Sequence, residues 1–413
     1  MVDRSGTFAS LRVHNYRLYA AGGLISNSGT WMGRVAQDWL VLTELTDHSA
    51  SALGIATGMQ FAPFLLLAPW SGMIADRFPK RRILLSTQST LAVTNLLLGV
   101  LTVTGAVQLW HVYALALVQG LAQAVDNPAR QTFVSEMVGP GLLANAVALN
   151  SASFNSGRLI GPGVAGLVIA AYGTGVAMLV NAASFLLLIL ALLAMRAGEL
   201  QPAPLARGRG QIREGIAYVR GRPDIQVVMV LVFVLGTFGM NFQITTALMA
   251  TRAFGKGPTE FGLLGSVMAV GSLSAALLSA RRARPRLRVL LVALAGFTVA
   301  SGLAALAPTY EWFAVALVPC GLAALTALTT ANALVQLSVD PSVRGRVMAL
   351  YMAIFMGGTP IGAPLIGRLG DLAGPRWTIG VGTIAVGLSV VVVGGWLVRR
   401  ENGRMKIRLW GRR

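Results

Sequence analysis

One carboxylate lies in a part of the chain that is otherwise almost wholly apolar. Asp38 falls well within the first long hydrophobic run, and Arg34 stands one helical turn before it. Asn27 and Trp31 continue the same stripe, because spacings of three and four residues return to one face of an α-helix. Ionisable side chains inside a bilayer are costly and mark ion pathways or substrate sites. We therefore predict that Asp38 carries protons while Arg34 tunes its proton affinity; the alternative is a structural pair that holds this helix to a neighbour.

Polar residues recur at helical spacing in four further apolar segments. Their amides are candidates for orienting a substrate, and the alternative is hydrogen bonding between helices, worth only about 0.6 kcal/mol in membranes. Arg158 has no acid in its own segment, so we expect it to meet Asp38, Asp126 or an anionic substrate. The polar positions, grouped by segment, are Gln119, Gln123, Asp126 and Arg130; Asn155 and Arg158; Asn241; and Asn332 and Gln336.

The elements that must position these side chains are predicted to be membrane-spanning helices. The chain has 413 residues, of which 55% are hydrophobic and only 12% are charged, whereas soluble proteins carry about 25% charged residues. The apolar runs are continuous, which argues against the alternating strands of a β-barrel. We predict an all-α membrane protein with twelve transmembrane helices at 18–42, 50–74, 83–104, 109–129, 144–171, 175–195, 225–249, 259–280, 288–307, 311–337, 345–370 and 377–398.

Lysine and arginine gather in every second link between these runs. The other links hold only Arg252, Lys256, Arg368 and Arg376. Because cytoplasmic loops carry the excess of positive charge, this asymmetry predicts that both termini are cytoplasmic and that the protein resides in the cell membrane. A net charge of +19 could also suit nucleic acid. The cations lie in short links rather than on one surface, however, so we expect no nucleic-acid partner.

The two halves of the sequence form a weak repeat. At an offset of 201 residues, Gly157 corresponds to Gly358, and the match continues through later glycines of the same run. Parallel repeats with a site near the midplane are a transporter architecture. We predict an N-terminal six-helix bundle at 1–195, a cytoplasmic linker at 196–224, a C-terminal six-helix bundle at 225–398 and a basic cytoplasmic tail at 399–413.

The link after the second predicted span carries a recognisable motif. Gly72, Asp76, Arg77 and Arg81 match the glycine, acid and basic positions of a loop found in the major facilitator superfamily, which the chain resembles over nearly its whole length. Pro79 stands near a position where the family pattern has glycine. The resemblance implies a twelve-helix fold of two pseudo-repeated bundles in which the first, fourth, seventh and tenth spans line a substrate cavity.

A second match points to one branch of that superfamily. Gly157, Gly161, Pro162 and Gly166 resemble the helix-packing motif of its exporting antiporters, although the last glycines of the pattern are incomplete. The segment "DNPARQTF" at 126–133, placed after the fourth span, resembles the drug:proton antiporters that include the enterobactin exporter. These matches imply efflux of drugs or siderophores.

The resemblance also implies a cytoplasmic gate. Asp76 would accept hydrogen bonds from the amino-terminal end of the eleventh span, where the helix dipole favours an anion. Arg77 and Arg81 would pair with Asp126, and Arg130 lies one turn beyond that acid. The alternative is a solvated loop that serves only as a topology anchor.

We therefore expect a proton-coupled exporter of hydrophobic or amphipathic small molecules that works by alternating access. An importing symporter on the same fold and a non-transporting receptor or scaffold are the alternatives. No phosphate-binding or nucleophile motif predicts an enzyme. Cys320 is the single cysteine and the three histidines are scattered, so we expect neither a metal site nor a cofactor. The expected partners are the lipid bilayer, protons and a small-molecule substrate, with the chain working as a monomer.

Overall fold

The computed structural model describes residues 6–201, 211–280, 285–340 and 343–401, and every regular element in these ranges is helical. Nine helices among the described residues are long and apolar enough to cross a membrane. The predicted all-helical membrane class is thereby confirmed, while the twelve-helix, two-bundle arrangement stays a prediction. The nine segments are Ala50–Leu67, Lys80–Val103, Thr174–Ala194, Pro223–Ala253, Pro258–Ser279, Leu287–Ala305, Tyr310–Ser338, Arg344–Ala373 and Pro375–Leu397.

The other three predicted spans also form helices. The spans predicted at 18–42, 109–129 and 144–171 correspond to α1 (His14–Trp39), α4 (Leu109–Met137) and α5 (Pro140–Tyr172). Each of these helices carries one of the polar stripes, and such residues make a helix less apolar. The helices that hold the candidate site are therefore the ones that hydropathy alone detects least well.

The chain divides into two compact units. Unit 1 comprises Met1–His48, Ala62–Arg207 and Lys256–Ser266, and unit 2 comprises Ser49–Phe61, Gly208–Gly255 and Val267–Arg413. Two helices, α2 (Ala50–Arg77) and α10 (Pro258–Ala280), contribute residues to both units. The other helices are α3 (Lys80–Val103) and α6 (Thr174–Ala194) in unit 1, and α7 (Gln211–Arg220), α8 (Pro223–Val234), α9 (Phe242–Leu248), α11 (Leu287–Ala305), α12 (Tyr310–Ser338), α13 (Arg344–Ala373) and α14 (Pro375–Glu401) in unit 2.

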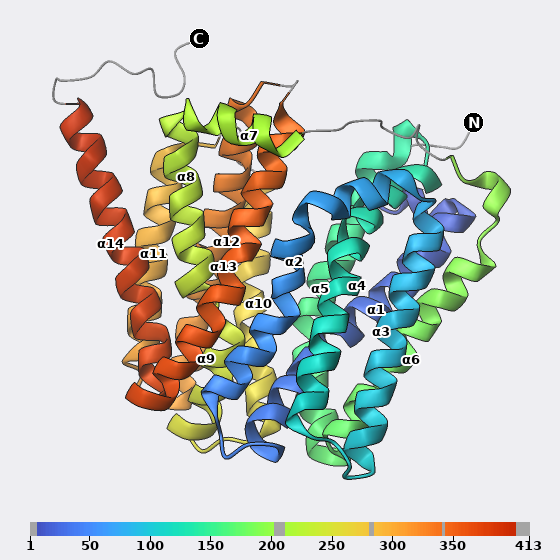
Figure 1. Ribbon diagram of the computed structural model, residues 1–413, viewed down its shortest axis with the longest axis horizontal. Helices are drawn as coiled ribbons and strands as arrows, with labels where there is room; N and C mark the ends of the chain where they lie inside the picture. The colour runs from blue at the N-terminus through green and yellow to red at the C-terminus, as the bar shows by residue number, and fades with distance from the viewer. Residues whose placement is uncertain (1–5, 202–210, 281–284, 341–342, 402–413) are drawn as a thin grey trace. The chain divides into compact units, whose positions relative to one another are not determined.

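Unit 1 is built around α1, which packs against α5 and α6, while α3 packs against α4 and α6 (Figure 1). A core of buried aromatic and aliphatic side chains joins these helices. Within it the rings of Tyr19 and Phe133 meet edge to face with centroids 5.8 Å apart. The hydroxyl of Tyr16 donates to the carbonyl of Ala146 at 2.7 Å, so its one polar atom is satisfied inside the core.

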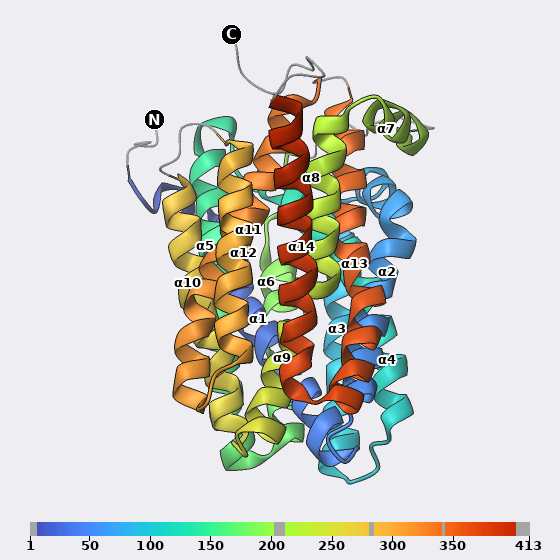
Figure 2. The same cartoon turned by 90° about the vertical axis from the view of Figure 1, so that its left-hand side faces the viewer.

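Unit 2 contains a layer of long helices in which α11 packs against α12 and α14 (Figure 2). Phe242 of α9 and Phe297 of α11 meet edge to face at 6.0 Å between centroids. The short helix α7, which lies in the predicted linker, packs against α13.

Two predicted boundaries need correction. The segment 126–133, expected to follow the fourth span, lies inside α4, which continues to Met137 and includes Pro128. The seventh predicted span, which lies in the apolar segment Pro223–Ala253, is interrupted, because a π-helical turn at Leu235–Gly239 follows α8 and α9 begins only at Phe242. Asn241 stands at this break. Interrupted helices of this kind often border transport sites in membrane carriers.

The predicted repeat has a structural counterpart, which begins at the glycines of α5. A β-carbon added at Gly157 would lie 2.8 Å from the backbone of Asn27, and one at Gly161 would lie 2.6 Å from the carbonyl oxygen of Ser28. Only glycine allows α5 to approach α1 this closely. A β-carbon at Gly166 would lie 2.6 Å from the carbonyl oxygen of Pro258, the first residue of α10.

The matching glycines of α13 repeat these contacts in unit 2. A β-carbon at Gly358 would lie 2.6 Å from the hydroxyl of Thr237, and one at Gly362 would collide with the carbonyl of the same residue. One at Gly367 would collide with the carbonyl of Ala50, the first residue of α2. In each half of the sequence, the first two glycines therefore allow close contact with the first span of that half. The third glycine allows close contact with the start of the second span of the other half.

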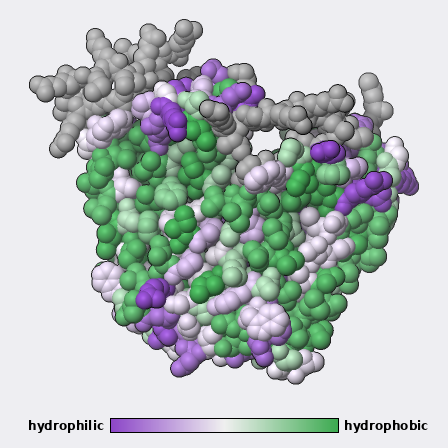
Figure 3. Space-filling model, viewed as in Figure 1, coloured by the Kyte–Doolittle hydropathy of each residue, from purple (hydrophilic) through white to green (hydrophobic). Residues whose placement is uncertain are grey.

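Hydrophobic side chains cover most of the face in Figure 3, and hydrophilic residues gather toward its two ends. Among the exposed apolar residues are Leu187 and Leu190 of α6 and Val391 and Val392 of α14. Large apolar surfaces of this kind are expected where lipid replaces water.

Candidate transport site

The indole of Trp31 is the centre of a charged and aromatic cluster in unit 1. The guanidinium carbon of Arg34 lies 4.9 Å from the Trp31 ring centroid, and that of Arg158 lies 5.6 Å from it. Phe154 meets the same indole edge to face at 6.0 Å. Two cations and a second aromatic ring therefore contact the same tryptophan ring.

The packing of α1 against α5 creates this cluster. Trp31 and Arg34 belong to α1, whereas Phe154 and Arg158 belong to α5. A β-carbon at Gly161 would lie 2.7 Å from that of Trp31, so the glycine stripe brings the α5 backbone directly against this residue. The sequence predicted both the stripe and the two arginines, but not that the arginines meet on one ring.

Asp38 is buried, with 5% of its surface exposed. Arg34 stands one turn before it, but no ion pair within 4.0 Å joins the two side chains in the described part of the chain. Arg34 instead donates to the amide oxygen of Gln123 on α4 at 3.1 Å. Arg34 and Asp38 nevertheless interact electrostatically, one turn apart on α1. The carboxylate is thus held near a cation without being locked to it.

Asp126 lies in a separate buried network. Its carboxylate accepts from the hydroxyl of Thr87 at 2.6 Å, from the amide of Gln88 at 2.9 Å and from Nε of Arg130 at 2.9 Å. The one-turn spacing of Asp126 and Arg130 predicted their proximity. With three donors on one carboxylate, this acid is satisfied within α3 and α4.

The predicted contact of Asp126 with Arg81 is absent from this structure. Arg81 donates to the carbonyls of Leu192 and Leu193 at 2.8 and 3.1 Å, near the carboxyl end of α6. A cation is favourable there because the last carbonyls of a helix lack partners and carry the negative end of its dipole. Arg77 is exposed.

The remaining gate residues, Gly72 and Asp76, lie within α2, but their side chains are outside the part of the chain that the structure describes. The latch of Asp76 onto the eleventh span therefore stays a prediction.

Sequence reasoning missed a buried ion pair at the start of α3. Nζ of Lys80 lies 3.0 Å from Oε1 of Glu136 on α4, and both side chains are less than a tenth exposed. No sequence spacing connects them, because the packing of α3 on α4 brings them together.

Asp371, near the carboxyl end of α13, was also missed. Its carboxylate accepts from the backbone amides of Ala50 and Ser51, each at 2.8 Å, at the amino-terminal end of α2. Arg252 lies 3.3 Å from the same carboxylate. All four residues belong to unit 2. The available signal was an acid at one span end and an arginine in a link that is otherwise poor in cations.

The predicted cavity amides have varied surroundings. Asn27 donates to the hydroxyl of Ser153 at 3.1 Å and so joins α1 to α5, whereas Asn155 donates to the carbonyl of Ser151 in its own helix. Gln119 is buried and its amide nitrogen has no hydrogen-bond partner among the described residues.

The amides of unit 2 share no hydrogen bond with one another among the described residues. Asn241 donates to the carbonyl of Thr237 at 2.7 Å, and its own amide oxygen has no partner among the described residues. Asn332 is partly buried and Gln336 is exposed. The structure thus brings Trp31, Arg34, Gln123 and Arg158 into one neighbourhood, with Asn27 one turn before Trp31 on α1.

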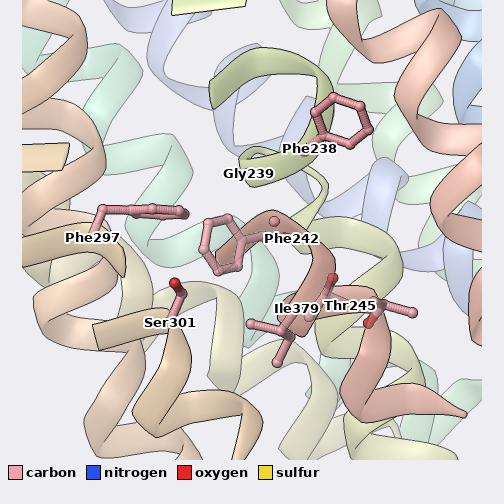
Figure 4. Close-up of a pocket in the computed structure, with 9 residues that line it drawn as sticks. Phe238, Gly239, Phe242, Thr245, Phe297, Ser301 and Ile379 are labelled. Carbon is pink, nitrogen blue, oxygen red and sulfur yellow. The ribbon is translucent and has the colours of Figure 1, made fainter. Parts of the chain in front are cut away.

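A small hollow lies in unit 2 among α9, α11 and α14 (Figure 4). Phe242 and Phe297 face it, together with the hydroxyl-bearing Ser301 and Thr245. Its volume is about 10 Å³, which is room for about one water molecule. In the described ranges, no three His, Cys, Asp or Glu side chains gather as ligands for a metal.

A family model described as transmembrane secretion effector matches residues 5–405, nearly the whole chain. The chain belongs to this family. Its members are transporters of the major facilitator superfamily, so the resemblance inferred from the sequence motifs is confirmed.

Curated relatives carry both siderophore and drug names. The chain is 26% identical to the staphyloferrin A transporter of Staphylococcus aureus, with 87% of this chain and 91% of the relative covered. It is 27% identical to the multidrug efflux pump Tap of Mycolicibacterium fortuitum, with 91% and 93% covered. It is 24% identical to the enterobactin exporter EntS of Shigella flexneri, with 86% and 85% covered. Transport across a membrane is the activity that these relatives share.

Solved structures support the fold. The nucleoside transporter NupG superposes with a TM-score of 0.71 at 14% identity, covering 93% of this chain and 98% of NupG. A bacterial homologue of the human lysosomal transporter Spinster, in an inward-facing and occupied conformation, gives a TM-score of 0.70 at 16% identity, covering 96% and 98%. The described helices therefore follow the fold of transporters in this superfamily.

Proposed function

We propose that this transporter is a proton-driven exporter of amphipathic organic molecules, with both termini in the cytoplasm, working by alternating access between two six-helix bundles. The observation that carries the proposal is the buried Asp38, one turn from Arg34 in a helix that belongs to a transporter fold. A buried carboxylate is costly when charged, so a nearby cation and changing hydration can switch it between its charged and neutral forms.

Export is favoured over import by the relatives. Two of them are named for efflux or export, the pump Tap and the exporter EntS. The glycine stripe of α5, which resembles the motif of exporting antiporters, also packs closely against the helix that carries Asp38. Proton coupling and outward direction are therefore proposed together.

Transport by the purified full chain in liposomes tests this proposal. Staphyloferrin A and enterobactin, named by the relatives, are the probes. We expect an imposed pH gradient to drive at least one of them against its concentration gradient, in the direction opposite to proton flow, and a protonophore to abolish the movement. Transport in the same direction as protons would replace the exporter with the importing symporter. Flux of neither probe under any gradient would contradict the proposal.

A further inference from the structure

We propose that Arg158 and Arg34 bind the acidic group of an organic anion whose apolar body packs on Trp31 and Phe154. This assignment of a substrate class rests on the proposed transport function. The cluster has two guanidinium groups on one indole, at 4.9 and 5.6 Å, with Phe154 against the same ring. The cluster thus combines two positively charged groups with two aromatic rings.

The charges of unit 1 support an anion at this place. Buried or partly buried ion pairs in its described part join Arg130 to Asp126 and Lys80 to Glu136, and Arg158 takes part in neither. Asp126 already accepts from three donors and is not free to compensate another cation. Near Trp31 there are therefore two positive groups, and the carboxylate of Asp38 lies one turn beyond Arg34 on α1. Both arginines are partly buried, and a partly buried cation gains from a nearby anion, so an anionic ligand would be favourable at this place.

The geometry suits a carboxylate in particular. A guanidinium presents planar, parallel N–H donors that match the two oxygens of a carboxylate. Arg158 comes from α5 and Arg34 from α1, and their guanidinium carbons lie 5.6 and 4.9 Å from the centroid of the same Trp31 ring, so two such groups are available in this neighbourhood. The Gln123 contact fixes one amino group of Arg34 and thereby orients the rest of that side chain.

A cationic drug fits this cluster poorly, because both arginines would repel it. The competing explanation is that Arg158 is structural and held only by its contact with Trp31. Such cation–π contacts are worth about 0.5–2 kcal/mol. The two explanations differ in whether the arginine discriminates an anion from its neutral counterpart.

Binding of 2-naphthoate and 2-naphthamide to the purified full chain in detergent, measured by titration calorimetry, distinguishes them. The two probes share an aromatic body and differ in the charge of one group. We expect the acid to bind at least tenfold more tightly than the amide. Arg158→Gln should lower the affinity for the acid by tenfold or more while leaving the affinity for the amide unchanged. Arg158→Lys should restore part of the lost affinity for the acid. Arg288→Gln, at an exposed position in α11, is the control for net charge.

Several outcomes would overturn the proposal: equal affinity for the two probes, no binding of the acid, or an equal loss in Arg158→Gln and Arg288→Gln. Should Arg158→Gln not fold, as judged by gel filtration, Arg34→Gln is expected to show the same selective loss of the acid. Failure of the transport function is separable from these results. A chain that binds 2-naphthoate through Arg158 but shows no pH-driven flux retains this site and loses the exporter assignment.

Discussion

The charged residues within the helices of unit 1 fall into two kinds. Asp126 is surrounded by donors and forms an i,i+4 ion pair with Arg130 at 2.9 Å. Asp38 has a cation nearby but no ion pair with it in the described part of the chain, and Arg158 rests on an aromatic face. A saturated network favours a fixed structure, whereas a carboxylate without a locked partner is free to change its protonation. We therefore propose that Asp126 stabilises the fold and that Asp38 couples transport to protons.

Asp126→Ala is expected to lower the free energy of unfolding by about 3–5 kcal/mol, because it leaves the Arg130 charge partly buried and unpaired. Chemical denaturation of the purified protein in detergent measures this change. Asp47→Asn, which alters a fully exposed acid, should be within about 0.5 kcal/mol of the parent. A loss below 1 kcal/mol in Asp126→Ala would show that the network contributes little.

At the scale of helices, glycines set how closely neighbours approach. Gly157 and Gly161 allow α1 to pack closely against α5. Gly358 and Gly362 allow the segment around Thr237 to pack closely against α13. This repetition was foreseeable, because the offset of 201 residues is visible in the sequence. The partner of Arg81 was not foreseeable, because the carbonyls it meets at the end of α6 are more than 100 residues away and carry no side-chain signal.

Gly161→Ala should destabilise the protein by about 1–3 kcal/mol, since its new methyl group would press on the backbone of Ser28. The midpoint of thermal unfolding in detergent measures the effect. Gly394→Ala in α14 is the matched control, because a β-carbon there has no neighbour within 4 Å. Similar unfolding midpoints for the two variants would refute the close α1–α5 packing.

Asp371→Ala should loosen the amino-terminal end of α2. Its carboxylate accepts from the amides of Ala50 and Ser51, and loss of such a cap typically costs about 1 kcal/mol. Hydrogen–deuterium exchange should therefore accelerate about fivefold or more at these two amides. The amides in the middle of α3, which do not touch Asp371, serve as the internal reference. Unchanged exchange at Ala50 and Ser51 would mean that this cap does not hold the helix end.

For the whole molecule, the sequence was sufficient to predict a membrane transporter of the major facilitator superfamily, because apolar runs and motif glycines are local features. The sequence could also place Asp38, Arg34 and Arg158 inside helices. It could not show that both arginines reach Trp31, that Arg34 donates to Gln123, or that the seventh span breaks beside Asn241. The first two features depend on contacts between side chains of different helices, and the third depends on where a single span is interrupted.

We propose that the Asp38 carboxylate couples substrate movement to protons. Flux in liposomes under an imposed pH gradient tests this proposal, with whichever of staphyloferrin A and enterobactin the parent transports, and compares the parent with Asp38→Asn and with the exposed-acid control Asp47→Asn. We expect gradient-driven flux in the parent and in Asp47→Asn, and flux at the background of protein-free liposomes in Asp38→Asn, with substrate binding still measurable. Gradient-driven flux in Asp38→Asn equal to that of the parent would contradict it.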